Sequence, residues 1–186
     1  MKSPSNVALL IIDIINSFRF GHGPILAERT LSIVPRIKAL KEVCRKKQIP
    51  IIYINDNYNI WRADVQKLIK HCTNDLSSPI INELHPDDSD YFLIKPKYSA
   101  FFGTGLNPLL SQLNIKQLIL TGIAGNICVL FTANDAYMRD YRLFVPADCI
   151  TSVDPKDNEY ALKMMNYVLD ARIDPSDQLI SLLSHF

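Results

Sequence analysis

The sequence predicts an α/β domain of three layers, in which helices cover both faces of a mainly parallel sheet. The prediction rests on short apolar runs rich in Val, Ile and Leu, and on helix-length segments between them. Strands of a parallel sheet are buried on both faces, so they form continuous apolar runs instead of alternating patterns. Strands that alternate with helices are typical of βαβ units.

The apolar runs give the strands of the expected sheet. VALLII is the first run, and QLILTGI is the longest. Each run is short enough for a strand and is followed by polar or turn-forming residues. We expect strands at 7–12, 50–55, 91–95, 117–123 and 142–146.

Three segments between or after the strands have the length and periodicity of helices. Apolar residues recur at helical spacing in each, as Leu162, Met165 and Leu169 do in the third. This spacing places the apolar side chains on one helix face, which packs on the sheet. We expect helices at 25–48, 124–140 and 157–171.

Two further segments differ from this pattern. The stretch 72–90 is polar and contains two prolines, so we expect a long connection before the third strand. The tail 175–186 keeps an apolar rhythm, which predicts a short helix docked on the protein or on a neighbouring subunit. With 186 residues, of which 48% are hydrophobic, the chain can bury one core, so 1–186 is expected to form a single domain.

Charge and cysteine content restrict the function. Lys and Arg exceed Asp and Glu by one, so the net charge is too small to produce an electrostatic field that attracts nucleic acid or an anionic membrane. The apolar stretch 7–12 is far shorter than the roughly 20 residues of a bilayer span and has no signal-peptide features. Cys44, Cys72, Cys128 and Cys149 form no C-x-x-C pair, which fits free thiols in a reducing compartment. We expect a cytoplasmic protein.

Ligands of an open parallel sheet bind beyond the carboxyl ends of the strands, so polar residues after apolar runs are the candidates. Asp13 ends the first run, where it could equally cap the segment that follows. Lys95 ends the third run, and a lysine buried there requires a carboxylate partner. Lys97 is the competing lysine, and we expect it to point to solvent.

Cys128 differs from the other cysteines, which we expect to be small buried hydrophobic residues. It lies where an apolar strand changes into a helix, and free N–H groups and the helix dipole at such a place favour a thiolate. Gly122, Ala124 and Gly125 leave backbone N–H groups uncovered beside it, as an oxyanion-binding site requires.

Three motifs in one order carry a family resemblance. ALLIIDIINSF at 8–18, IKPKYSAFFGT at 94–104 and LTGIAGNICVLFTANDAYMRDY at 120–141 resemble the motifs of the isochorismatase-like cysteine hydrolase superfamily. VPADCITS at 145–152 extends the resemblance over nearly the whole chain. The resemblance implies a Rossmann-like α/β/α fold and homo-oligomerisation.

The resemblance also implies a catalytic triad of Asp13, Lys95 and Cys128. In such a site Asp13 accepts the thiol proton, Lys95 balances the charge, and Cys128 attacks a carbonyl carbon to form a thioester. A cis peptide between Ile123 and Ala124 would turn the N–H groups of Ala124 and Cys128 toward the substrate oxygen. The implied reaction is cleavage of a C–N bond in a small amide or carbamoyl substrate, without a cofactor.

Departures from family patterns narrow this function. Nicotinamidases of the superfamily carry an Asp-x-His metal cluster after the second strand, whereas this sequence has Asp56 with no histidine nearby. We therefore predict no metal. Isochorismatases lack the nucleophilic cysteine, so Cys128 favours amide hydrolysis. A vinyl-ether hydrolase that uses Asp13 as acid, and a non-catalytic binding protein on the same fold, stay as alternatives.

Aromatic and basic residues near the motifs are candidates for a substrate pocket. Trp61 and Arg62 could roof it, with Arg62 binding a substrate carboxylate. Phe18, Tyr98 and Phe131 could form its apolar walls. The alternatives are structural: Trp61 covering the core, Arg62 exposed or paired with a nearby aspartate, and the other aromatics packed in the core.

Overall fold

The computed structural model describes residues 6–60 and 64–184. Within this part of the chain the sheet has six strands, in the order β3-β2-β1-β4-β5 with β6 beside β4, and their pairings are parallel. The strands are β1 (Val7–Ile12), β2 (Ile51–Asp56), β3 (Tyr91–Lys95), β4 (Gln117–Ile123), β5 (Arg142–Phe144) and β6 (Ile150–Thr151).

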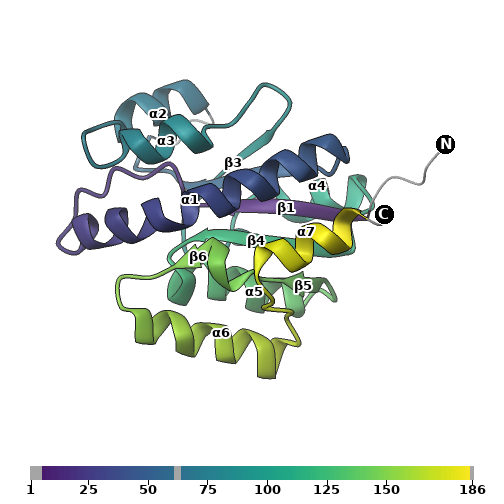
Figure 1. Cartoon of the computed structure of the whole chain (residues 1–186). Helices are drawn as coiled ribbons and strands as arrows, with labels where there is room; N and C mark the ends of the chain where they lie inside the picture. Colours follow the sequence, from purple (N-terminus) through teal and green to yellow (C-terminus); the bar gives the residue numbers. More distant parts are fainter. Residues whose placement is uncertain (1–5, 61–63, 185–186) are drawn as a thin grey trace.

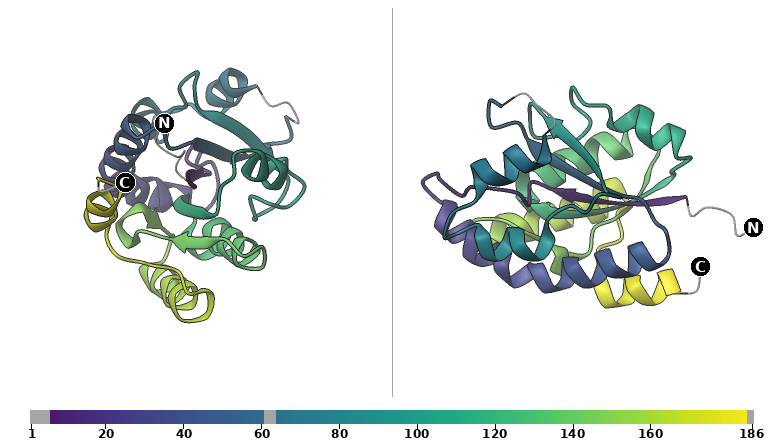
Figure 2. Two further views of the ribbon diagram at one scale, coloured as in Figure 1. Left: turned by 90° about the vertical axis from the view of Figure 1, so that its right-hand side faces the viewer. Right: turned by 90° about the horizontal axis from the view of Figure 1, so that it is seen from above.

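Helices cover both faces of this sheet (Figures 1 and 2). Side chains of α1, α3 and α7 share one apolar cluster with one face of the strands, and those of α4, α5 and α6 share a second cluster with the other face. The predicted three-layer α/β/α fold is confirmed. The helices are α1 (Gly23–Lys46), α2 (Val65–Cys72), α3 (Ser78–Leu84), α4 (Leu106–Gln112), α5 (Leu130–Tyr137), α6 (Pro155–Leu169) and α7 (Ser176–Ser184).

The expected strands are present, but full burial on both faces holds only for the central ones. β1 is buried along its length, because β2 and β4 flank it and helices cover it. β3 lies at an edge of the sheet, and its first residue Tyr91 is 39% exposed. The prediction of complete burial was therefore wrong for β3.

The segment 72–90 contains a helix that was not predicted. Ile80, Ile81 and Leu84 are buried in the core, and the α3 helix that carries them packs against α1. The prolines and acidic residues around it obscured this short apolar pattern. The long connection expected before β3 is thus present, and it contains a short helix.

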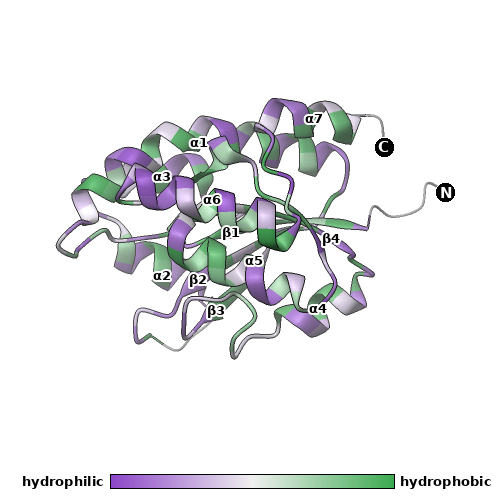
Figure 3. Cartoon of the chain, turned by 90° about the horizontal axis from the view of Figure 1, so that it is seen from below, coloured by the Kyte–Doolittle hydropathy of each residue, from purple (hydrophilic) through white to green (hydrophobic). Residues whose placement is uncertain are grey.

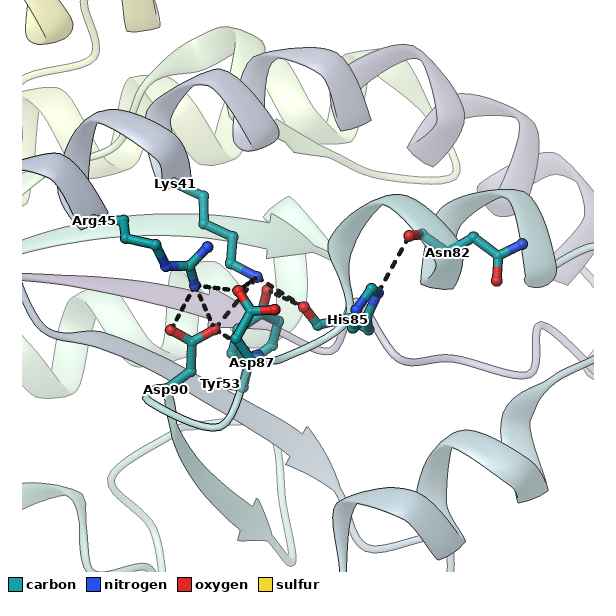
Figure 4. A network of polar contacts seen from close by, with 7 residues as sticks. All are labelled: Lys41, Arg45, Tyr53, Asn82, His85, Asp87 and Asp90. Atoms are coloured by element: carbon teal, nitrogen blue, oxygen red, sulfur yellow. Dashed lines mark hydrogen bonds and ion pairs between the residues drawn. The ribbon is translucent and has the colours of Figure 1, made fainter.

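A partly buried polar network ties the chain between α3 and β3 to α1 (Figure 4). The Lys41 ammonium donates to the carbonyl oxygen of His85 at 2.7 Å and lies 3.3 Å from Oδ2 of Asp90. Arg45 Nη2 lies 2.9 Å from Oδ1 of the same aspartate, which is almost completely buried. These contacts fix the start of β3, and the strand ends at Lys95.

The C-terminal helix α7 docks on its own chain. Leu179 and Leu183 are buried in the cluster that includes α1. Asp148 accepts hydrogen bonds from the backbone N–H and the hydroxyl of Ser176 at 2.8 and 2.7 Å, which holds the start of this helix. Within the described residues, no helix has the length and apolar character needed to cross a membrane.

Candidate active site

Three strands bring Asp13, Lys95 and Cys128 to the carboxyl edge of the sheet. Asp13 follows β1, Lys95 is the last residue of β3, and Cys128 lies in the π-helical turn η1 (Gly125–Val129) that follows β4. The strand order reverses between β1 and β4, because the chain continues from β1 to β2 on one side and returns to β4 on the other. Ligands of open α/β sheets bind at such a point.

The three side chains are in direct contact. The Lys95 ammonium lies 2.8 Å from Oδ2 of Asp13 and donates to Sγ of Cys128 at 3.5 Å. The Cys128 thiol is also within hydrogen-bonding reach of the Asp13 carboxylate. Lys95 is buried and paired with a carboxylate, as its position in the sequence predicted, whereas Lys97 is exposed.

Burial dominates the electrostatics of this cluster. It raises the pKa of the Asp13 carboxyl, and the positive charge of Lys95 opposes that rise. Burial is the largest single effect on Lys95 and disfavours its charge, but Asp13 and the nearby Cys128 and Asp56 together outweigh it and raise the pKa of the lysine. Burial, reinforced by Asp13, raises the pKa of the Cys128 thiol.

The expectation that a helix N-terminus favours a Cys128 thiolate was therefore wrong. The thiol sits inside the π-helical turn, where the carbonyl of Ala124 accepts from the N–H groups of Ile127 and Val129 at 3.0 and 3.2 Å. Burial and the negative charge of Asp13 raise the pKa of the thiol, which favours a protonated resting state. A nucleophilic Cys128 needs a base, and Asp13 is the carboxylate in contact with it.

Asp13 does not cap a following helix. Its backbone is in the left-handed region (φ 51°), which an aspartate tolerates better than most residues. Its Oδ1 accepts from the backbone N–H of Asp56 at 2.8 Å, while its Oδ2 faces Lys95. Sequence reasoning missed this contribution of Asp56, because it comes from the backbone of the neighbouring strand β2.

A second network, also missed, holds the turn that carries Cys128. The backbone N–H of Asn126 donates to the hydroxyl of Ser152 at 3.0 Å, and this fully buried hydroxyl donates to Oδ1 of Asn158 at 2.9 Å. Gly125 has no space for a side chain, since an added Cβ would lie 2.1 Å from the same Oδ1. The turn is thus packed against β6 and the start of α6.

The peptide bond between Ile123 and Ala124 is cis. This bond lies at the end of β4, directly before the turn that contains Cys128. Thr132 fixes the other side of the turn, since its hydroxyl donates to the carbonyl of Cys128 at 2.7 Å and accepts from the N–H of Ala100 at 3.0 Å.

The aromatic pocket candidates lie in different environments. Phe18 is 1% exposed and belongs to the core cluster under α1, as its structural alternative proposed. Tyr98 and Phe131 are 55% and 50% exposed, and the centroids of their rings lie 5.5 Å apart. Trp61 and Arg62 lie outside the described residues.

Within residues 6–60 and 64–184, no three His, Cys, Asp or Glu side chains gather in a way that could hold a metal ion. His71 packs against Tyr58, with ring centroids 5.6 Å apart and the rings tilted by 51°. That the candidate active site works without a metal ion stays a prediction.

Comparison with known proteins identifies the family. The family model described as the isochorismatase domain matches residues 7–173, which is most of the chain. The chain belongs to the isochorismatase family. The predicted family resemblance is thus confirmed, and the protein is a hydrolase of this family.

Individual members of the isochorismatase family are similar over almost the full length. The uncharacterized family protein YaaI of Bacillus subtilis (strain 168) is 54% identical over 178 residues, covering 96% of this chain and 98% of that protein. An isochorismatase family protein from Desulfovibrio vulgaris has a TM-score of 0.78 at 26% identity, with 96% and 98% of the two chains covered. N-carbamoylsarcosine amidase from Thermoplasma acidophilum has a TM-score of 0.71 at 29% identity, with 92% and 96% covered.

Proposed function

We propose that this protein is a metal-independent cysteine hydrolase that cleaves a C–N bond of a small amide or carbamoyl substrate. The observation that carries the proposal is the position of the Lys95 ammonium, which lies 2.8 Å from Asp13 Oδ2 and 3.5 Å from Cys128 Sγ. A nucleophile, a carboxylate base and a balancing charge in mutual contact are the parts that covalent hydrolysis requires.

The first step transfers the thiol proton of Cys128 to the Asp13 carboxylate. The raised pKa of the thiol makes this transfer necessary at neutral pH, and the raised pKa of Asp13 makes the carboxylate a stronger base than an exposed one. Lys95 keeps a positive charge beside the sulfur, so the emerging thiolate is stabilised without a metal.

The thiolate then attacks the carbonyl carbon, and the carbonyl oxygen becomes an oxyanion that the N–H groups of Ala124 and Cys128 stabilise. The tetrahedral intermediate collapses as Asp13 returns the proton to the leaving nitrogen, which departs as ammonia or an amine and leaves a thioester. Asp13 next accepts a proton from water, whose oxygen attacks the thioester. Collapse releases the acid, and Asp13 returns the proton to the sulfur.

Two observations support an amide or carbamoyl substrate. Cys128 touches both charged members of the cluster, which an acid-catalysed ether hydrolysis by Asp13 alone would not need. One similar structure is an N-carbamoylsarcosine amidase. Tyr98 and Phe131 each follow a member of the cluster by three residues in the sequence, and their half-exposed rings pack together. We propose them as one wall of a small pocket.

The test is ammonia release from a panel of small amides and ureido acids. The variants Cys128→Ala, Asp13→Asn and Lys95→Met are each expected to lose about a thousand-fold or more in kcat/KM, because members of such a unit act together. Cys44→Ala is the matched control, since it removes a buried thiol outside the cluster and is expected to keep kcat.

The outcomes separate the candidate functions. Loss of activity in the three variants with retention in Cys44→Ala supports the cysteine hydrolase. Activity that depends on Asp13 but survives Cys128→Ala supports an ether-type hydrolysis with Asp13 as acid. Absence of turnover over the whole panel, together with saturable binding of a panel compound, would favour a binding protein.

A further inference from the structure

The strand β2 lies between β1 and β3 and pairs with both in parallel, so the carboxyl ends of the three strands share one edge of the sheet (Figure 3). Asp13 follows β1 at this edge, and Lys95 is the last residue of β3. The strand β2 ends with Asn55 and Asp56, and Asp56 is in register with Lys95. The end of β2 thus lies beside both charged members of the candidate site.

The chain leaves the geometry of a strand at Asp13. The N–H of this residue donates to the carbonyl oxygen of Ile54 at 2.9 Å, which continues the pairing of β1 with β2. Its φ of 51° then turns the backbone away from the strand direction. A left-handed residue of this kind persists only where the surrounding structure holds it. The chain just beyond Asp13 therefore needs its own contacts with the rest of the protein.

Asn55 makes such a contact. Its Nδ2 donates at 2.7 Å to the carbonyl oxygen of Ile15, two residues beyond Asp13, and Asn55 is fully buried. The next residue, Asp56, donates its backbone N–H to Oδ1 of Asp13 at 2.8 Å. Two consecutive residues of β2 therefore hold the Asp13 carboxylate and the backbone that follows it.

The protein uses only one end of the Asn55 amide. Its Oδ1 is buried and has no hydrogen-bond partner within residues 6–60 and 64–184. A buried acceptor of this kind costs at least as much stability as one hydrogen bond contributes, so the amide adds little net stability. Ile51 and Tyr53, which share its face of β2, belong to the apolar cluster under α1. The amide in this apolar setting is therefore explained by the carbonyl that its N–H group holds.

We propose that Asn55 is a positioning residue for Asp13. Its hydrogen bond to Ile15 holds the backbone beyond Asp13, and this keeps the Asp13 carboxylate against the Lys95 ammonium and the N–H of Asp56. The effect of Asn55 on a reaction rate rests on the proposed hydrolase function. The position of Asp13 itself can be measured without a substrate.

The ionisation of Asp13 depends on its position. The titratable groups that face its carboxylate or lie within electrostatic range are Lys95 of β3, Cys128 of η1, and Asp56 and Tyr58 at and after the end of β2. Burial raises the pKa of Asp13 most strongly, whereas its contacts with Lys95, Cys128 and the N–H of Asp56 lower it. A small displacement breaks these contacts but leaves the carboxyl buried, because the next residue, Ile14, is fully buried. The pKa of a displaced Asp13 therefore rises further.

The test is an NMR titration of the side-chain carboxyl carbon of Asp13 in the full chain, with Asp13→Asn identifying the signal by its loss. Asn55→Leu removes the donor and fits the apolar surroundings, and it is expected to move the titration midpoint about one pH unit above that of the wild type. Asn166→Leu is the matched control. It removes the same kind of bond, from Nδ2 to the carbonyl of Ala171 at 2.9 Å near the end of α6, and is expected to leave the midpoint unchanged.

Hydrolysis of the best amide gives a second readout. Asn55→Leu is expected to lose about 10–100-fold in kcat while KM stays within about twofold, because a displaced Asp13 slows proton transfer but does not touch the N–H groups that bind the substrate oxygen. The acid limb of kcat/KM is expected to move to higher pH together with the NMR midpoint. A purely structural role would lower stability and leave both midpoints in place.

Far-UV circular dichroism checks that the variants fold. Asn55→Ser is the second variant if Asn55→Leu unfolds, since its hydroxyl ends one bond short of the amide nitrogen, and it is expected to move the midpoint in the same direction. An Asp13 midpoint that a folded Asn55 variant leaves at the wild-type value would overturn the proposal. A shifted midpoint in a protein that hydrolyses no amide would support the positioning of Asp13 and count against the proposed function alone.

Discussion

The Lys95 ammonium lies 2.8 Å from Oδ2 of Asp13, and their side chains are only 2% and 8% exposed. Each charge has lost most of its water, so each depends on the other for compensation. Such a pair is costly to break by removing one partner and less costly to remove as a whole.

The variant Lys95→Met is expected to lower the free energy of unfolding by about 3–5 kcal/mol, because it leaves the buried carboxylate of Asp13 without its counter-charge. Urea denaturation at neutral pH measures the change. Lys97→Met is the matched control, since Lys97 is exposed two residues away and is expected to contribute less than about 0.5 kcal/mol. Equal effects of the two substitutions would contradict the buried pair.

The double variant Asp13→Asn/Lys95→Met is expected to be less destabilised than the sum of its single variants. It removes both charges, so no uncompensated charge stays in the core. The same denaturation experiment gives the four stabilities of the cycle. Simple additivity would show that the two residues do not interact.

The pH profile of kcat/KM is expected to fall on the acid side at a pH above the ordinary range of an aspartate. Asp13 accepts a proton only when ionised, and burial raises its pKa, so activity is lost as the pH falls through that raised value. Below it, the rate is expected to fall about tenfold per pH unit. A profile that stays flat to the pH of an exposed aspartate would contradict this role.

Alkylation with iodoacetamide is expected at Cys128 before Cys44 and Cys72, which are fully buried and whose pKa values burial raises to about 12. The pKa of Cys128 is raised as well, so its rate is expected to grow about tenfold per pH unit between pH 7 and 9. Peptide mass spectrometry follows each site. A rate of alkylation at Cys128 that no longer changes with pH near neutrality would indicate a preformed thiolate and contradict the protonated resting state.

Removal of the Ser152 hydroxyl is expected to disturb the turn that carries Cys128. Ser152→Ala leaves the N–H of Asn126 and Oδ1 of Asn158 without this partner, which is expected to cost about 1–3 kcal/mol of stability. Displacement of the turn is expected to lower kcat roughly 10–100-fold. Ser32→Ala, on the exposed surface of α1, is the control and should change neither quantity. An unchanged kcat in Ser152→Ala would separate this network from catalysis.

The sequence predicted the layers of the fold because β1 and β4 are uninterrupted apolar runs, and such runs leave few alternatives to buried parallel strands. It did not predict β6, because Ile150–Thr151 is too short to form a pattern. The edge position of β3 was equally hidden. Strand order depends on which strands pair in space, and apolar content does not encode it.

The sequence predicted some features of the candidate site correctly and missed others. The burial of Lys95 beside a carboxylate followed from the cost of an unpaired buried charge, and the structure has this pair. The protonation of Cys128 was misjudged, because Cys128 lies within a π-helical turn and burial raises the pKa of its thiol. Asp56 supports Asp13 through its backbone N–H, which almost any residue type could donate, so no sequence signal could reveal it. Ser152 contributes its hydroxyl, but the group that donates to it is the backbone N–H of Asn126, and the sequence does not show that the two residues meet.

The central claim, that Cys128 forms a covalent intermediate, is tested most directly by mass spectrometry of enzyme quenched in acid during turnover of the best amide. The account predicts an adduct with the mass of the acyl group on the peptide that contains Cys128, and its absence from Asp13→Asn. Turnover without such an adduct, with Cys128→Ala hydrolysing the same amide at the wild-type rate, would contradict it.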